Sequence, residues 1–421
     1  MGRGPGALTL GTSFAGQFFM LISGVIAARA LGVEGRGTLA LLWLLPLILA
    51  LVGGIGIAPA TTYFVARESR NVPAVIRLSL QATALLAIGL SLLYGLGLYL
   101  FAGDNHEFGL ADAALSVALI PLFLGQNLAI ATLLGQERFR PYNAARLIPV
   151  AIYAALSLAV VIVGSATLTT ILAAALTGWV VALGFSWVMI RRRLPRPTGE
   201  PEVTRGEIVS FGLRGVVGSV SPIDDVRLDQ FMVGLLLDAH ALGLYVSAIA
   251  FCNIQRFMAQ AVGALSYPRI AAERRGPQAW GLTSRYFRIG LLLVAAATVV
   301  LLLVLPFLLP LLFGDEFSAA VGLGRILLAG TFFLAVHRLL TELARGLGHP
   351  GYASISEAVN AAVFLFVVFL VLSPITEHGI AWAVVAGGIV CSGLLGTLIF
   401  RLRKPLLAGQ PNEQGARLPV D

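Results

Sequence analysis

The sequence contains little charge. Asp, Glu, Lys and Arg make up 12% of its 421 residues, whereas hydrophobic residues make up 58% and the mean hydropathy is +0.89. Soluble chains carry roughly 25% charged residues, so the composition excludes a soluble globular protein. Apolar runs of about 20 residues or longer match membrane-spanning helices, whereas barrel strands are about 10 residues of alternating polarity. We therefore predict an all-α polytopic membrane protein.

Cysteine and lysine are also scarce. The two cysteines, Cys252 and Cys391, lie in separate apolar runs, and the sequence has no CxxC motif and no His/Cys cluster. We therefore predict no metal site and no cofactor. Lys404 is the only lysine, so the formal net charge of +8 comes from arginine. In a membrane protein, the positions of basic residues depend first on the topology of the chain, so the positive charge is not evidence for a nucleic-acid ligand. We predict no such ligand.

Apolar segments bounded by Gly, Pro and charge predict about twelve transmembrane helices. Their expected ranges are 8–31, 38–65, 77–101, 110–134, 144–164, 167–190, 208–237, 241–265, 287–313, 319–345, 352–373 and 379–400. The odd-numbered connections are acidic, with Arg36 as their only basic residue, and the even-numbered connections hold the arginines. By the positive-inside rule, this alternation places both termini in the cytoplasm.

The chain shows signs of an internal duplication. A Pro-rich charged linker, 191–207, separates an N-terminal six-helix lobe, 1–190, from a C-terminal lobe, 208–402, and a cytoplasmic tail, 403–421, follows. AARALGVEGRGTLA (27–40) aligns without gaps on VGLLLDAHALGLYV (233–246), which pairs Gly37 with Gly243. Both copies would begin on the same side of the membrane, so we predict a parallel pseudo-two-fold repeat of two six-helix bundles.

Three segments carry a resemblance to a known family: ARALGVEGRGTLA (28–40), GQERFRPYNAARL (135–147) and RLDQFMVGLLLDAHALGLY (227–245). With the number of spans, they make residues 8–402 resemble the Wzx-type polysaccharide or lipid-linked oligosaccharide flippases of the multidrug/oligosaccharidyl-lipid/polysaccharide exporter superfamily. The related peptidoglycan-precursor lipid flippases typically have fourteen spans, which makes that subgroup a weaker alternative.

The resemblance implies a MATE-like, V-shaped pair of bundles. It implies alternating-access transport of an undecaprenyl-diphosphate-linked oligosaccharide across the bacterial cytoplasmic (inner) membrane, for polysaccharides such as lipopolysaccharide. It implies no catalytic residue and no enzyme activity. The partners implied are membrane lipids and the lipid-linked oligosaccharide, with a polysaccharide polymerase and glycosyltransferases as further partners.

The predicted seventh span is unusual because it carries five charged residues. Arg214, Gly218, Pro222, Asp225 and Asp229 recur at helical spacing and would share one face. Ionisable groups at membrane depth are costly and usually face a cavity or a partner. The functional hypothesis is that the arginines, including Arg227, bind diphosphate or acidic sugar and that Asp224, Asp225 and Asp229 couple transport to protons or ions. The alternative is an ion-pair network that packs helices.

Two further spans of the second half contribute candidates. Asn253, Arg256 and Gln260 form a stripe on the eighth span, where Arg256 either binds diphosphate or offsets Asp225 or Asp229. The tenth span carries Arg325, which has a snorkelling alternative, then His337, Arg338 and Glu342. Arg338 and Glu342 have the spacing of a helical ion pair. Arg325 and Arg338 are substrate-binding candidates, Glu342 is a coupling candidate, and a packing role is favoured for His337.

The first half has almost no charge within its predicted helices. Gln17, Gln126 and Asn127 are candidates for contact with sugar hydroxyls, although amides also serve interhelical hydrogen bonding. A MATE-like exporter of small cations, the main alternative function, would need an acidic or aromatic cavity. The second half instead has five intramembrane arginines against four carboxylates, which favours an anionic substrate.

Overall fold

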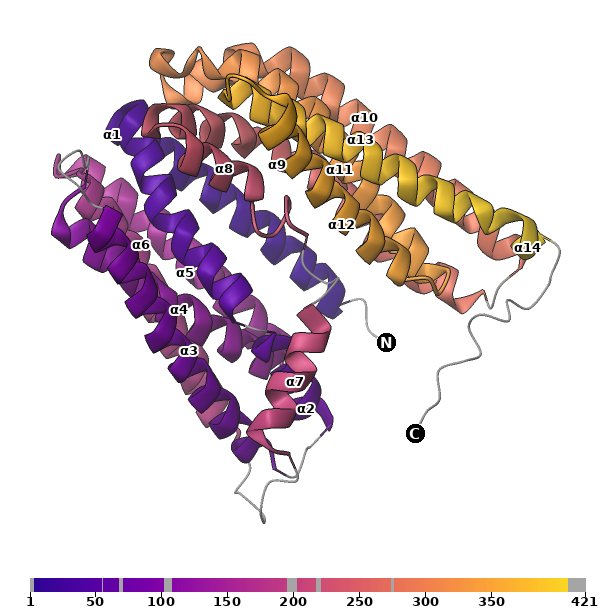
Figure 1. The fold of residues 1–421 in the computed structure, drawn as a ribbon. Coiled ribbons are helices and arrows are strands. Elements are labelled where there is room, and N and C mark those ends of the chain that lie inside the picture. The colour runs from indigo at the N-terminus through magenta and orange to yellow at the C-terminus, as the bar shows by residue number, and fades with distance from the viewer. Residues whose placement is uncertain are drawn as a thin grey trace. The chain divides into compact units, whose positions relative to one another are not determined.

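A computed structural model shows a helical fold (Figure 1). It describes residues 4–54, 56–67, 71–101, 108–194, 203–216, 221–273 and 276–407, and no strand occurs in these ranges. Parts of the predicted linker and tail, 195–202 and 408–421, lie outside the described residues. The α-helices are α1 (Gly4–Gly53), α2 (Ile57–Arg67), α3 (Val72–Phe101), α4 (Leu110–Gly135), α5 (Phe139–Ile162), α6 (Leu168–Arg191), α7 (Arg205–Val216), α8 (Leu228–Leu236), α9 (Ala239–Ala272), α10 (Pro277–Phe313), α11 (Ala320–Gly346), α12 (Gly351–Phe366), α13 (Glu377–Arg401) and α14 (Arg403–Leu407).

Within the described ranges, ten helices are long and apolar enough to cross a membrane. Large apolar side chains are exposed along them, including Tyr99 on α3, Phe307 on α10 and Leu370 in the π-helical turn Val367–Val371 that follows α12. Exposed apolar surface of this extent faces lipid and not water. The prediction of an all-helical, multi-pass membrane protein is confirmed.

Helix α1 contains two helical segments that meet at Gly32. The backbone of Gly32 has φ 70° and ψ −173°, a conformation that glycine adopts without strain. The first predicted span therefore ends in the expected place. The second is divided, because α1 ends at Gly53, Gly56 has φ 66°, and α2 begins at Ile57.

The predicted seventh span is not one helix, so the expected single face from Arg214 to Asp229 is wrong. Helix α7 ends at Val216, α8 begins at Leu228, and residues 221–227 form turns between them. Proline at 222 has no N–H for a helical hydrogen bond, and Ser and Asp side chains nearby offer the backbone other partners. Gly218 and the side chain of Arg214 lie outside the described residues.

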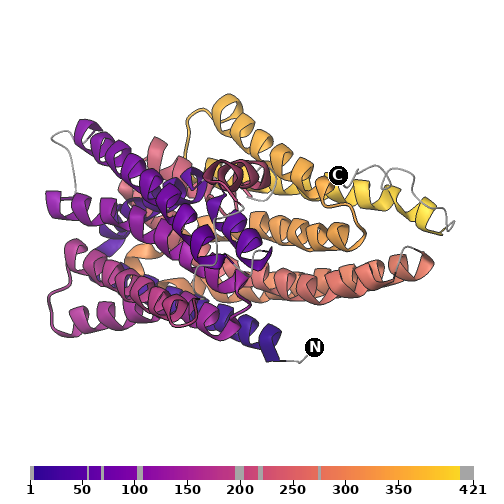
Figure 2. The ribbon, with the colours of Figure 1, turned by 90° about the horizontal axis from the view of Figure 1, so that it is seen from below.

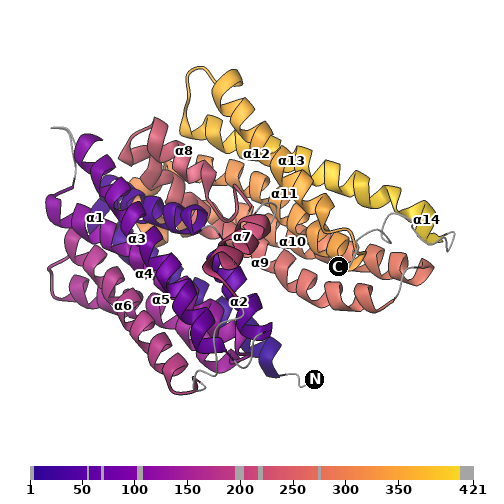
Figure 3. The same ribbon diagram turned by 60° about the horizontal axis from the view of Figure 1, so that its bottom comes forward.

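The chain forms two compact units. The first comprises residues 1–220, 237–247 and 312–317, and the second comprises 221–236, 248–311 and 318–421. In the first unit, α1 packs on α4 and α5, and α6 packs on both of those helices (Figure 2). Trp43 on α1 packs on both α4 and α5, with ring centroids 5.9 Å from Phe123 and 5.5 Å from Tyr153. Helix α7 also belongs to this unit, because it packs on α2 through Phe211, stacked 4.5 Å from Tyr63 (Figure 3).

The first unit also holds a direct backbone contact between α1 and the start of α9. A Cβ at Gly37 would lie 1.7 Å from the carbonyl oxygen of Ala239, and one at Gly243 would lie 2.0 Å from that of Val33. Carbonyl oxygens cannot move aside as a flexible side chain can, so both positions require glycine. These are the two glycines that the sequence alignment placed at equivalent positions.

The second unit is built on close packing of α13 against α11 and α12. A Cβ at Gly388 would lie 3.2 Å from the carbonyl oxygen of Gly330, the kind of small-residue contact that lets membrane helices approach. Gln255 on α9 is fully buried and donates to Thr298 on α10 (2.6 Å) and accepts from Thr331 on α11 (2.5 Å). These bonds fix the rotation of α9 and thereby the direction of the neighbouring Arg256.

Candidate functional site

The turns between α7 and α8 form a compact structure that we call the aspartate loop, residues 221–227. The N–H of Ser221 donates to Oδ2 of Asp225 (3.0 Å), and the N–H of Asp225 donates to the carbonyl of Ser221 (2.9 Å). The carbonyl of Pro222 accepts from the N–H of Leu228 (3.0 Å), which joins the loop to α8. Arg227 has φ 55°, a strained conformation for a residue with a side chain, of a kind that clusters at functional sites.

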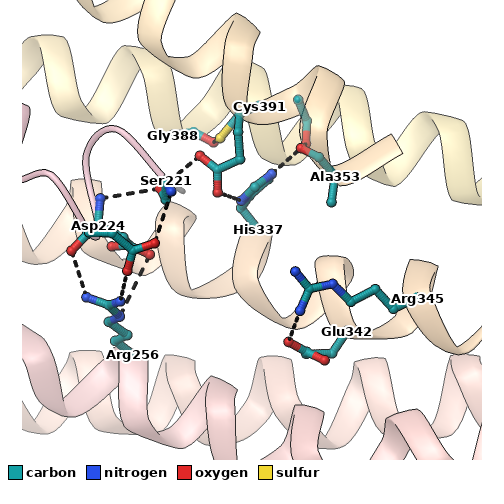
Figure 4. A network of polar contacts seen from close by, with 12 residues as sticks. Ser221, Asp224, Arg256, His337, Glu342, Arg345, Ala353, Gly388 and Cys391 are labelled. Atoms are coloured by element: carbon teal, nitrogen blue, oxygen red, sulfur yellow. Dashed lines mark hydrogen bonds and ion pairs between the residues drawn. The ribbon is translucent and has the colours of Figure 1, made fainter. Parts of the chain in front are cut away.

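Arg256 on α9 holds this loop (Figure 4). Its Nη1 donates to the carbonyl oxygen of Asp224 (3.0 Å) and its Nη2 to Oδ1 of Asp225 (3.1 Å), while Nε lies 3.8 Å from Oδ2 of Asp224. The side chains of Arg256, Asp224 and Asp225 remain 25%, 16% and 31% exposed, so another anion can reach the guanidinium. The sequence left open whether Arg256 binds a diphosphate or offsets Asp225 or Asp229; in this structure it contacts Asp225 and Asp224.

A small cavity lies beside this ion pair within the second unit. Its polar lining includes Asp224, Arg227, Asp229, Asn253 and Arg256, and its volume is about 30 Å³. This volume suits one or two water molecules and is far too small for a diphosphate. A diphosphate would therefore have to displace the aspartates from Arg256.

Glu357 on α12, a carboxylate that was not among the predicted site residues, contacts the aspartate loop. Its Oε2 accepts from the hydroxyl of Ser221 (2.9 Å), and its Oε1 lies 3.6 Å from Nδ1 of His337 on α11. His337 is 2% exposed, and its Nε2 lies 2.7 Å from Oγ of Ser356. The available signal was a carboxylate inside the predicted span 352–373, where charge is costly. Glu357 brings the intramembrane carboxylates of the second half to five, equal to the arginines counted there, so that count does not favour an anionic substrate.

The geometry around His337 determines where a proton can be held. The hydroxyl of Ser356 donates to the carbonyl of Ala353 (2.9 Å), so it accepts from an Nε2–H on His337. A neutral imidazole then has a lone pair on Nδ1, which faces the carboxylate of Glu357. At 3.6 Å the two atoms are within ion-pair range but beyond hydrogen-bond distance. A proton taken up by either group would make this contact attractive, so we call His337 and Glu357 the proton-holding pair.

Three other candidates of the second unit, Gln260, Arg325 and Glu342, lie apart from this cluster, whereas Arg338 lies near Glu357. Gln260 and Arg325 are exposed, and neither lines the cavity. Glu342 pairs with Arg345 (3.0 Å), not with Arg338 (Figure 4). Arg338 is half-buried, and its Nε has no hydrogen-bond partner.

In the first unit, Gln126 is fully buried. It donates to the carbonyl of Ala145 on α5 (2.8 Å) and lies 3.4 Å from the hydroxyl of Ser186 on α6, so it serves interhelical bonding. Gln17 and Asn127 are exposed. Arg36, which the sequence placed in a connection, lies inside α1, and its buried Nε has no hydrogen-bond partner. Among the described residues, no three His, Cys, Asp or Glu side chains are grouped as metal ligands.

The polysaccharide biosynthesis protein family model matches residues 2–273, more than half of the chain. A probable low-salt glycan biosynthesis flippase of Haloferax volcanii, Agl15, is 24% identical over 215 residues. That match covers 50% of this chain and 44% of the relative, so this chain spans less than half of the relative's length.

Solved structures show the same fold at low sequence identity. One is the lipid II flippase MurJ in an inward closed conformation, with a TM-score of 0.76, 13% identity and coverage of 94% of this chain and 87% of that one. Another is an inward-facing multidrug resistance MATE family transporter of the MOP superfamily, with a TM-score of 0.69, 14% identity and coverage of 94% and 96%. The predicted resemblance is confirmed: the chain belongs to the polysaccharide biosynthesis protein family.

Proposed function

We propose that this protein transports a polyprenyl-diphosphate-linked oligosaccharide across a bacterial cytoplasmic membrane by alternating access. The membrane would be crossed twelve times, with both termini in the cytoplasm. In the part of the chain that the structure describes, ten helices are candidate spans, and one of them, α1, would cross twice because it is divided at Gly32. The α7–α8 pair would provide the twelfth crossing. The Gly37–Gly243 contact supports a two-fold repeat, because equivalent residues of such a repeat can meet each other at its axis.

The observation that carries the substrate class is the bonding of Arg256. Its planar guanidinium is held by a carboxylate and a carbonyl oxygen, the kinds of acceptor that a diphosphate can replace. In this proposal the diphosphate displaces Asp224 and Asp225, and Arg227 and Asn253, which line the same cavity, complete the site. The aspartate loop is then no longer held by Arg256, so binding of the diphosphate affects α8, to which the loop is joined.

The proton-holding pair supplies the coupling. Protonation of Glu357 removes its charge, and a hydrogen bond to a neutral acceptor is weaker than one to a charged acceptor by roughly 1 kcal/mol. The bond from Ser221 therefore weakens, and the aspartate loop is released from α12. The charged and titratable groups that face Glu357 are His337 and Arg338 on α11, Asp224 and Asp225 in the loop, and Cys391 on α13.

Replacing Glu357 with glutamine is therefore expected to make the transport rate less sensitive to pH while the protein stays folded. Glutamine keeps the hydrogen bond from Ser221 but cannot take up a proton. The control is Glu377→Gln, which changes a similar Glu–His pair, Glu377 with His378 (3.2 Å), at the partly exposed start of α13. Transport that keeps the wild-type pH profile in Glu357→Gln would exclude this pair as the coupling site.

Deletion of the gene tests the substrate. The expected result is accumulation of a polyprenyl-diphosphate-linked oligosaccharide inside the cell together with loss of the surface polysaccharide, because synthesis would continue while export stops. A plasmid copy should reverse both effects. If the surface glycan is unchanged and the cells become sensitive to cationic drugs, the protein is a drug exporter instead.

A further inference from the structure

A second polar cavity lies at the arginine-rich end of the α9–α10 hairpin, apart from the aspartate loop. Its volume is about 500 Å³. It is lined by Arg269 and Glu273 at the end of α9 and by Leu282, Arg285, Tyr286 and Ile289 on α10. The spacing of the four α10 residues places them on one helical face, so the cavity is a groove between that face and the end of α9.

The polar part of the groove is preorganised for an anion. Arg269 donates to the hydroxyl of Tyr286, and its guanidinium carbon lies 5.9 Å from the centre of the tyrosine ring. These contacts hold a long, otherwise mobile side chain in place. Arg285 is exposed on the same wall. Arg269 and Arg285 together with Glu273 give the groove a net positive charge. The sequence of the segment 269–288 contains three further arginines, Arg274, Arg275 and Arg288.

The apolar part of the groove continues into a stripe along α10. Beyond Ile289, the same face carries exposed apolar side chains as far as Leu311, about 33 Å at 1.5 Å per residue. This length matches the hydrocarbon core of a bilayer. The stripe consists of Ile289, Leu292, Leu293, Val299, Val300, Leu303, Phe307 and Leu311. The groove therefore lies where the membrane-facing surface of α10 meets the polar boundary.

We infer that this groove binds the phosphate of an anionic phospholipid, with Arg269 and Arg285 on the phosphate and the acyl chains along the α10 stripe. A free anion would use the arginines but not the apolar stripe, whereas a lipid uses both. Basic pockets at the ends of transmembrane helices are known to bind lipid head groups in this way. The site does not depend on the proposed transport activity.

The test is binding of phosphatidylglycerol to the purified full-length protein in detergent, measured by native mass spectrometry. The double variant Arg269→Gln/Arg285→Gln is expected to bind phosphatidylglycerol about 30-fold more weakly. Each arginine contributes about 1 kcal/mol, and the loss of both corresponds to this factor. Phosphatidylcholine should bind the wild type more weakly than phosphatidylglycerol. Glu273→Gln should strengthen phosphatidylglycerol binding, because it removes the one negative charge in the groove.

The matched control is Arg67→Gln on α2. Arg67 also contacts a tyrosine, since its Nη1 lies 3.2 Å from the hydroxyl of Tyr63, but it lies outside the groove. This variant should bind phosphatidylglycerol like the wild type. Equal affinity of the double variant and the wild type would overturn the proposal. So would equal weakening by Arg67→Gln, or displacement of phosphatidylglycerol by millimolar inorganic phosphate, which would indicate a free-anion site. Tighter binding of polyprenyl phosphate than of phosphatidylglycerol would assign the groove to the transported lipid and also overturn it.

Discussion

Replacing Arg256 with glutamine is expected to lower transport of a polyprenyl-diphosphate-linked oligosaccharide about 100-fold. Two charge-assisted hydrogen bonds from the guanidinium to a diphosphate contribute about 3 kcal/mol, and each 1.4 kcal/mol is a factor of ten. Arg256→Lys should keep part of the activity, because it retains the charge but loses the parallel pair of donors. The measurement is the initial rate of lipid translocation in vesicles that contain the purified protein.

Arg256→Gln would also be inactive if Arg256 only formed a structural ion pair with the aspartate loop. The aspartate therefore has to be changed as well. If Arg256 only neutralises the aspartate loop, Arg256→Gln/Asp225→Asn should recover part of the transport, because the two charges that pair at 3.1 Å are gone and only Asp224, 3.8 Å from Arg256, keeps its charge. If Arg256 binds the substrate, the double variant should stay inactive, while Asp225→Asn alone should bind the diphosphate more tightly because a competitor has been removed. Arg77→Ala, exposed at the start of α3, is the control for loss of an arginine and should leave transport unchanged.

Substituting alanine for Gly37 is expected to lower stability by at least 1–3 kcal/mol, the usual range for overpacking. A methyl group 1.7 Å from the carbonyl oxygen of Ala239 forces α1 and the start of α9 apart, and backbone atoms there cannot yield. Gly243→Ala should have the same effect through Val33. The readout is the midpoint of thermal unfolding of the purified protein, together with the transport rate.

Gly97→Ala is the matched control for the glycine contact. Gly97 lies on α3, and a Cβ there would meet no atom within 4 Å, so alanine should leave stability unchanged or raise it slightly. Unfolding of Gly37→Ala at the wild-type temperature would show that the two helices are not in backbone contact in the membrane. The proposed repeat would then lose its main structural support.

The overall class of fold was predictable from the sequence because the bilayer imposes a length on every spanning segment. Most helix ends lie within a few residues of the expected positions, as for α4 and α6. The alignment of Gly37 with Gly243 also identified two residues that the structure brings into contact. The seventh span was predicted wrongly because its hydropathy and helical spacing were compatible with a helix, whereas hydrogen bonding around Ser221, Pro222 and Asp225 favours turns.

The residues of the candidate site were predictable only in part. Charge inside an apolar segment identified Arg256 and the aspartates, since burial of charge needs a partner. Which partner each one finds depends on packing between distant helices, so Glu357, His337 and Ser221 emerged as one network only in the structure. The same limit applies to Gln126, whose amide bonds neighbouring helices, and to Gln260, which is exposed while Arg256 one turn earlier lines the cavity.

The most direct test of substrate and mechanism is translocation of a defined polyprenyl-diphosphate-linked oligosaccharide by the wild-type protein in sealed vesicles. Lipid that reaches the opposite leaflet is detected by an enzyme that acts only on exposed glycan, and protein-free vesicles give the background. The expected result is translocation well above background that is slowed by an excess of the same lipid without its glycan, because Arg256 would bind the shared diphosphate. Translocation at the background rate by folded protein, over the range of pH gradients tried, would contradict the proposed function.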